Sequence, residues 1–122
     1  MAQKIAIMED EELILNLLEK KLTKEGYELL IARNGEEGLK LIKEKTPDLI
    51  LLDIIMPIKG GFEVLEEMQK DENLKNVPVI IISNSGQPVE IDRAQKLGAK
   101  DWLIKTDFDP QEVVDKIKKQ IG

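Results

Sequence analysis

The 122-residue chain contains neither cysteine nor histidine. Without cysteine it can form no disulfide and no thiolate metal site. Without histidine it lacks the commonest general base, the usual zinc ligand and any phosphohistidine of its own. Aromatic residues make up only 3% of the sequence, so the core has to be built from Ile, Leu and Val.

Long apolar runs and a basic surface are also missing. No segment approaches the roughly 20 apolar residues that a membrane-spanning helix needs. The N-terminal MAQKIAIMEDEE has a short apolar stretch followed at once by acids, which is unlike a signal peptide. A net charge of −6 argues against direct binding to nucleic acid, because phosphate contacts require a basic face. We therefore expect a soluble, cytoplasmic protein that binds neither nucleic acid nor membranes.

Short β-rich runs alternate with longer amphipathic stretches along the whole chain. Strands are expected at residues 4–8, 28–32, 48–53, 79–83 and 101–104. Three of these runs carry consecutive aliphatic residues, as buried strands of a parallel sheet do. The intervening stretches have helical spacing, and the weakest pattern is the fourth, around 89–97. Five strand–helix units predict one α/β domain, a doubly wound parallel sheet with helices on both faces.

Capping signals agree with this division of the chain. Gly26 and Gly98 stand where two of the helices are expected to end. Asp109, Pro110 and Glu112 form a typical helix start, with an N-cap acid, proline at the first helical position and a glutamate three residues after the cap.

Asp53 is unusual because it interrupts an aliphatic segment, PDLILLDIIMP, that is expected to be buried. A buried carboxylate is costly unless it is paired, hydrogen-bonded or bound to a metal. Asp53 ends the third predicted strand, and ligands of doubly wound sheets bind at the carboxyl ends of the strands. Its position therefore indicates a functional site.

The neighbouring strands end in residues that suit the same site. Glu9 and Asp10 follow the first strand, Ser83 ends the fourth and Lys105 follows the fifth. Three carboxylates at one edge repel one another unless a cation such as Mg²⁺, which prefers oxygen ligands, joins them. Beside the metal and Lys105, the Asp53 carboxylate is a suitable nucleophile toward a phosphoryl group, to which the Ser83 hydroxyl can donate a hydrogen bond.

Most of these residues also have a purely structural interpretation. Asp10 suits the N-cap of the following helix, and Ser83 can bond to the backbone. Glu9 and Lys105, taken singly, are ordinary surface residues. Asp53 has no comparable alternative, and the five together favour a functional site.

Four segments resemble, in order, the motifs of response-regulator receiver domains: IAIMEDEE, DLILLDIIMP, PVIIISNSG and GAKDWLIK. The resemblance covers essentially the whole chain and implies a flavodoxin-like fold with strand order 2-1-3-4-5 and five helices. It implies that Asp53 accepts a phosphoryl group from the phosphohistidine of a sensor histidine kinase or histidine phosphotransfer protein. The implied magnesium ligands are Glu9, Asp10, Asp53 and the backbone carbonyl of Ile55.

The same resemblance implies how the signal is switched and ended. Ser83 would move toward the phosphoryl group, and the rotamer of Trp102 would follow it. The fourth helix, fifth strand and fifth helix would form the surface that controls an unidentified protein partner. Ile55 and Ser85 would flank the phosphoryl group; neither is an acid or base and Ile55 is bulky, so we expect slow autodephosphorylation.

Three positions depart from the family. Asn84 replaces the usual small residue after the switch hydroxyl, and Trp102 is larger than the usual Tyr or Phe. Thr106 stands where the family has a proline joined by a cis peptide bond. A cis bond before a non-proline residue costs about 2.5–4 kcal/mol, so we expect a trans bond and a rearranged loop. That change bears on whether Lys105 reaches the site.

The leading hypothesis is a signalling receiver, a monomer for which pairing upon phosphorylation stays open. Nothing follows the fifth predicted helix, so we expect residues 1–122 to carry no output domain, as a stand-alone regulator or a fragment. A receiver-fold binding scaffold, natural or engineered, without phosphotransfer is the second hypothesis. A flavin-binding enzyme is disfavoured, because MEDEEL after the first strand would repel a phosphate.

Overall fold

Strands and helices alternate along the chain in the computed structural model, which describes residues 2–107 and 109–122. The strands are β1 (Lys4–Met8), β2 (Glu28–Ala32), β3 (Leu49–Asp53), β4 (Val79–Ser83) and β5 (Asp101–Ile104). The helices are α1 (Glu12–Lys24), α2 (Gly35–Glu44), α3 (Gly61–Gln69), α4 (Pro88–Lys96) and α5 (Pro110–Ile121). Four strands have the predicted bounds; β3 begins one residue later than predicted.

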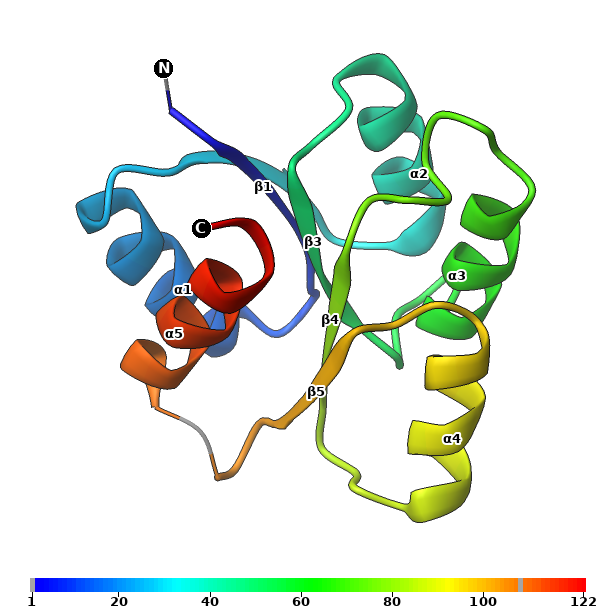
Figure 1. Ribbon diagram of the computed structural model, residues 1–122. Coiled ribbons are helices and arrows are strands. Elements are labelled where there is room, and N and C mark those ends of the chain that lie inside the picture. Colours follow the sequence, from blue (N-terminus) through cyan, green and yellow to red (C-terminus); the bar gives the residue numbers. More distant parts are fainter. Residues whose placement is uncertain (1, 108) are drawn as a thin grey trace.

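All neighbouring strands are parallel, and their order is β2-β1-β3-β4-β5. Helices α1 and α5 cover one face of the sheet, and α2, α3 and α4 cover the other (Figure 1). The flavodoxin-like strand order implied by the sequence motifs is therefore confirmed. None of the helices in the described residues is both long and apolar enough to cross a membrane.

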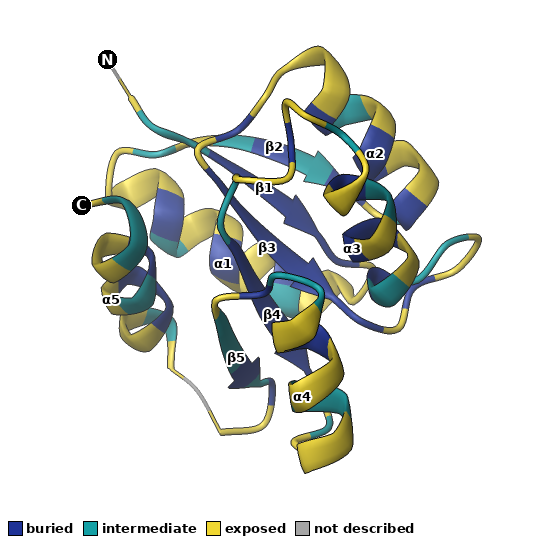
Figure 2. Cartoon of the chain, turned by 45° about the vertical axis from the view of Figure 1, so that its right-hand side comes forward, coloured by how far each residue is buried: buried dark blue, intermediate teal, exposed yellow. Residues whose placement is uncertain are grey.

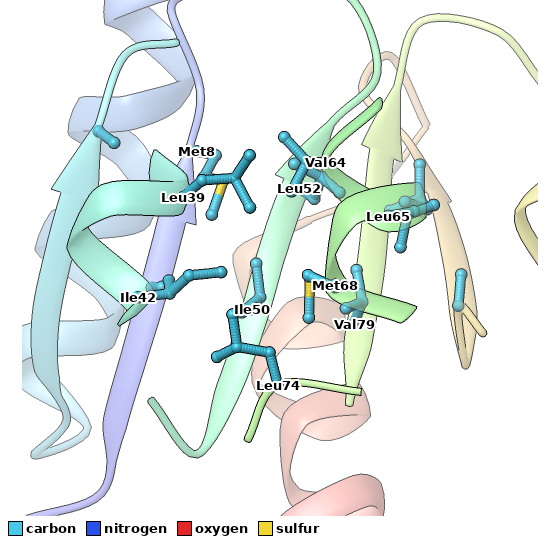
Figure 3. Packing of buried hydrophobic residues seen from close by; sticks show 14 of the residues in the cluster. Met8, Leu39, Ile42, Ile50, Leu52, Val64, Leu65, Met68, Leu74 and Val79 are labelled. Atoms are coloured by element: carbon cyan, nitrogen blue, oxygen red, sulfur yellow. The ribbon is translucent and has the colours of Figure 1, made fainter. Parts of the chain in front are cut away.

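The consecutive aliphatic residues of the central strands serve two separate cores. Successive side chains of a strand point to opposite faces of the sheet. Ile50 and Leu52 accordingly belong to the core on the side of α2 and α3, where Figure 3 shows Leu52 beside Val64. Leu49 and Leu51 belong to the core on the side of α1 and α5. A strand covered by helices on both faces needs apolar residues at every position, as observed.

Helix ends follow the predicted capping signals. The Asp109 side chain accepts a hydrogen bond of 2.9 Å from the Glu112 backbone N–H, as an N-cap does. Gly26 and Gly98 have φ values of +93° and +101°, and each follows the C-cap residue of its helix, Glu25 for α1 and Leu97 for α4. Most residues avoid this left-handed conformation, which glycine adopts without steric cost.

Helix α4 is attached to the sheet by little buried surface, which explains its weak sequence pattern. Ala94 is the one buried residue among Pro88–Lys96. Val89, in the first turn, is 81% exposed. Figure 2 shows the mostly exposed surface of α4 beside the buried strands. An apolar stripe is therefore nearly absent from this helix.

The loop between β3 and α3 contains an unfavourable backbone conformation. Ile58 has φ of +70° although its side chain is β-branched and 74% exposed. The left-handed region costs about 1–2 kcal/mol for residues other than glycine, asparagine and aspartate. Exposure leaves Ile58 little packing energy to offset that cost.

Replacing Ile58 by Asn is therefore expected to raise the free energy of unfolding by about 1 kcal/mol, measured by urea denaturation. Ile55→Asn is the matched control, because Ile55 is equally exposed at 75% and its φ is not positive. Equal effects of the two variants would contradict the explanation by backbone strain.

Candidate functional site

A pocket of about 190 Å³ opens where the strands end, at the carboxyl edge of the sheet. Parallel register explains its position, because Asp53 pairs with Ile82 in β4 and Ser83 pairs with Ile104 in β5. The chain thus brings together side chains that are far apart in sequence. The pocket is lined by Asp10, Glu11, Asp53, Ile55, Ser83, Asn84 and Lys105.

Lys105 is the centre of the site. Its Nζ atom lies 2.9 Å from Asp53 Oδ2 and 3.0 Å from the Glu9 carboxylate. Burial lowers the pKa of Lys105, but the hydrogen bonds from its ammonium to Asp53 and Glu9 outweigh burial and raise the pKa above its ordinary value. The lysine therefore stays charged at any physiological pH.

The loop after β5 accommodates Thr106 without a cis bond, since all peptide bonds between described residues are trans. The Lys105 backbone N–H donates a 2.7 Å hydrogen bond to the Ser83 carbonyl, which extends the pairing of β4 and β5 by one residue. That bond fixes the start of the lysine side chain beside the pocket. Lys105 thus reaches Asp53 despite the missing proline.

Asp53 is buried at the end of β3, and each of its two carboxylate oxygens accepts one hydrogen bond. Oδ2 accepts from Lys105, and Oδ1 accepts a longer hydrogen bond of 3.3 Å from the Ile55 backbone N–H. Its side chain is 5% exposed. The pairing with Lys105 offsets the cost of burying this carboxylate, and the open pocket leaves it accessible to a reactant.

Glu9 lies beneath the pocket, close to Asp53 and Lys105. Burial raises the pKa of Glu9 to about 7; the hydrogen bond from the Glu11 backbone lowers it, and the neighbouring Asp53 raises it further. Glu9 Oε1 is buried 3.0 Å from Lys105 Nζ and forms an ion pair with it, but it accepts no well-directed hydrogen bond from any residue that the structure describes. Such an oxygen still has lone pairs free to coordinate a bound cation.

The pKa of Glu9 predicts how stability depends on pH in EDTA. The ordinary pKa of a glutamate is 4.5, and that of Glu9 in the folded protein is about 7. Between pH 4.5 and about pH 7 the folded state therefore binds more protons than the unfolded state. Stability must then fall as pH rises through this window and level off above it. The contribution of Glu9 is on the order of 3 kcal/mol.

Urea denaturation between pH 4.5 and 8 measures this dependence. Glu9→Gln is expected to remove most of the decrease in stability with rising pH, because glutamine does not titrate. Glu12→Gln is the control, since that side chain is 60% exposed and pairs with Arg33 instead. A Glu9→Gln curve parallel to that of the wild type would contradict the prediction.

Three of the predicted metal ligands are close enough to share one ion. Glu9, Asp10 and Asp53 each offer a carboxylate oxygen, and these oxygens lie within 4.8 Å of one another. An all-oxygen set beside open space suits Mg²⁺, which usually keeps several waters. This donor set, all carboxylate oxygens, fits the predicted magnesium site.

Ser83, the last residue of β4, and the two residues that follow it have different surroundings. Ser83 and Asn84 line the pocket, and the Ser83 hydroxyl oxygen accepts a 3.2 Å hydrogen bond from the Ser85 backbone N–H. Ser85 is not among the lining residues; its hydroxyl donates a 2.6 Å hydrogen bond to Glu90 in α4. Ser83 thus makes a backbone bond, as its structural interpretation expects, and lines the same pocket as Asp53.

Trp102, in β5, is not among the residues that line this pocket; it is half-buried on the side of the sheet that α4 covers. Its indole N–H donates a 2.8 Å hydrogen bond to the Ser85 carbonyl. The loop after β4 is therefore tied to β5 through the side chain of Trp102.

Glu11 is the residue of the site that the sequence interpretation did not single out. Its carboxylate lies 3.3 Å from Lys105 Nζ and 3.5 Å from Asn84 Nδ2. The sequence contained one signal, because Glu11 directly follows the acidic pair Glu9 and Asp10.

Comparisons with known proteins show what the chain as a whole is similar to. Residues 5–118 match the family model described as the response regulator receiver domain. The chain is 34% identical over 116 residues to the "Probable transcriptional regulator ycf27" of Porphyra purpurea, a match that covers 95% of the chain and 46% of that protein. The chain thus spans about half the length of the curated relatives it matches.

Two solved structures show the same fold at low identity. A putative response regulator from Chloroflexus aurantiacus has a TM-score of 0.92 at 27% identity, over 99% of this chain and 98% of that chain. The phosphorylated cyanobacterial phytochrome response regulator RcpA has a TM-score of 0.86 at 28% identity, over 99% of this chain and 94% of that chain.

Proposed function

Because the chain belongs to the family of response regulator receiver domains, we propose that Asp53 accepts a phosphoryl group from the phosphohistidine of a histidine kinase or histidine phosphotransfer protein. One observation carries this proposal. The buried Asp53 carboxylate lines an open pocket, and its Oδ2 atom lies 2.9 Å from Lys105 Nζ. Receiver domains are signalling modules, and the chemistry here modifies the chain itself.

The proposed transfer makes one bond and breaks one. An Asp53 oxygen bonds to phosphorus while the bond from phosphorus to the imidazole nitrogen of the donor breaks, and the leaving imidazole receives any proton it needs from solvent. Lys105 hydrogen-bonds to the transferred group, and the Ser83 hydroxyl can donate to another of its oxygens. Such donors stabilise the charge on the transferred oxygens, the main catalytic effect in phosphoryl transfer.

Magnesium would be held by the carboxylates of Glu9, Asp10 and Asp53 and, by the resemblance to the family, by the carbonyl of Ile55. An ion bound there would neutralise charge on the phosphoryl oxygens and would remove the repulsion among the acids. The residues of the chain hold the nucleophile and orient it toward the donor.

Intact-protein mass spectrometry after incubation with acetyl phosphate tests the proposal. With Mg²⁺ the wild type is expected to gain one phosphoryl group, and peptide mapping is expected to place it on Asp53. In EDTA the gain is expected to be lost. No adduct, together with no Mg²⁺ binding, would favour the alternative of a receiver-fold scaffold without phosphotransfer.

The phosphoryl group is proposed to be long-lived. Ile55 lines the pocket and offers no acid or base to an attacking water. The Ser85 hydroxyl is engaged by Glu90, and the Asn84 side chain narrows the same entrance. Decay of the adduct in the same experiment measures the lifetime, and a half-life of seconds would contradict slow hydrolysis.

Control of a partner is proposed to run through α4, β5 and α5. The Ser85 contacts to Glu90 and to Trp102 join the loop after β4 to α4 and β5. The Lys116 ammonium lies 2.9 Å from Asp101 Oδ2, which joins α5 to β5. A movement of Ser83 would therefore change the positions of side chains on the surface formed by α4, β5 and α5.

A further inference from the structure

Glu11 occupies the open side of the pocket. Its side chain is 48% exposed, whereas the side chains of Asp53 and Lys105 are 5% and 3% exposed. Glu11 Oε1 lies between two hydrogen-bond donors, 3.3 Å from Lys105 Nζ and 3.5 Å from Asn84 Nδ2. A reactant that approaches Asp53 from solvent therefore passes the carboxylate of Glu11.

The contact between Glu11 and Lys105 occupies the Lys105 ammonium, a hydrogen-bond donor that an incoming phosphoryl group requires. Phosphoryl donors are anions, and the transferred group needs the Lys105 ammonium. In the resting chain that ammonium is shared by three carboxylates, those of Glu9, Glu11 and Asp53. Glu9 and Asp53 are buried and fixed, so Glu11 is the partner that can leave without exposing an unpaired buried charge.

We propose that Glu11 is a positioning residue that competes with the incoming phosphoryl group for Lys105 and thereby slows phosphorylation of Asp53. Asn84 holds the Glu11 carboxylate in this position from the other side. The inference rests on the proposed function, since it concerns the rate at which Asp53 becomes phosphorylated.

The competition is testable with acetyl phosphate and Mg²⁺. An Asp53 oxygen bonds to phosphorus, the bond from phosphorus to the acetyl oxygen breaks, and acetate leaves. Glu11→Gln keeps the shape of the side chain and removes its charge, so the second-order rate constant is expected to rise several-fold. Glu12→Gln is the matched control, because it removes the same charge from the next residue, which pairs with Arg33, and its rate is expected to stay near wild type.

Salt dependence separates the competition from a change in structure. Chloride salts screen exposed charges, so increasing KCl is expected to speed the wild type and Glu12→Gln more than Glu11→Gln. Glu11→Asp keeps the charge on a shorter side chain that no longer reaches Lys105, and its rate is expected to lie between those of the wild type and Glu11→Gln. Asn84→Ala is expected to give a smaller increase than Glu11→Gln.

The outcomes distinguish this inference from the proposed function. If the wild type is labelled but Glu11→Gln is no faster than Glu12→Gln, the competition by Glu11 is refuted and the receiver function stands. Equal rates for Glu11→Asp and the wild type would likewise refute the competition for Lys105. A wild type that takes up no phosphoryl group refutes both.

Discussion

A chain with Asp53 replaced by Asn is expected to take up no phosphoryl group from acetyl phosphate, whereas the wild type gains one. Asparagine has nearly the same shape and can still accept a hydrogen bond from Lys105. Its amide oxygen is neutral and a poor nucleophile, so the covalent step cannot occur. Intact-protein mass spectrometry of both chains, treated side by side with Mg²⁺, measures the difference.

Asp48→Asn is the matched control for this prediction. Asp48 directly precedes β3 at the opposite end of the strand and accepts a hydrogen bond from the Lys4 backbone N–H, which asparagine can also accept. This variant is expected to be labelled like the wild type. A phosphoryl group on Asp53→Asn would mean that another side chain is the acceptor.

The second large effect is expected for Lys105→Met, which should lower the free energy of unfolding by about 3 kcal/mol near pH 8 in EDTA. The substitution leaves Glu9 and Asp53 buried at the same edge with no ammonium between them. Removing one partner of a buried ion pair is far more costly than removing an exposed one. Urea denaturation measures the loss.

The same variant should also be phosphorylated about 100-fold more slowly, because Lys105 is a donor to the transferred group. Lys100→Met serves as the control, since Lys100 is exposed and lies outside the pocket. Lowering the pH toward 5 should restore part of the stability of Lys105→Met, as Glu9 takes up a proton. Unchanged stability of Lys105→Met would show that the acids are not paired with Lys105 as described.

The fold could be predicted from sequence because its signals are local. Runs such as LILL and VIII specify strands that are covered on both faces, and Gly26, Gly98 and Asp109 mark helix ends through their own backbone chemistry. Because all the strands are parallel, their carboxyl ends lie at the same edge of the sheet. Glu9, Asp10, Asp53, Ser83 and Lys105 meet there because each stands at the end of a strand.

Features that depend on loop geometry could not be predicted in the same way. The sequence did not say whether Lys105 reaches Asp53 when Thr106 replaces the usual proline, because a backbone bond to Ser83 decides it. The contact of Glu11 with Lys105 joins residues 94 positions apart through a flexible side chain. Ile58 has a left-handed backbone that its residue type disfavours, so no sequence rule indicates it.

The sparse attachment of α4 has a consequence for the energy of signalling. A helix whose one fully buried side chain is the methyl group of Ala94 gives up little buried apolar surface when it shifts, since burial of one methylene-sized group is worth about 0.8 kcal/mol. Two positions of α4 can then differ by only a small free energy. A ligand shifts the equilibrium between them by the difference between its binding free energies for the two states. One or two new hydrogen bonds to a phosphoryl group, at about 1.5–3 kcal/mol each when charged, are enough to reverse the populations.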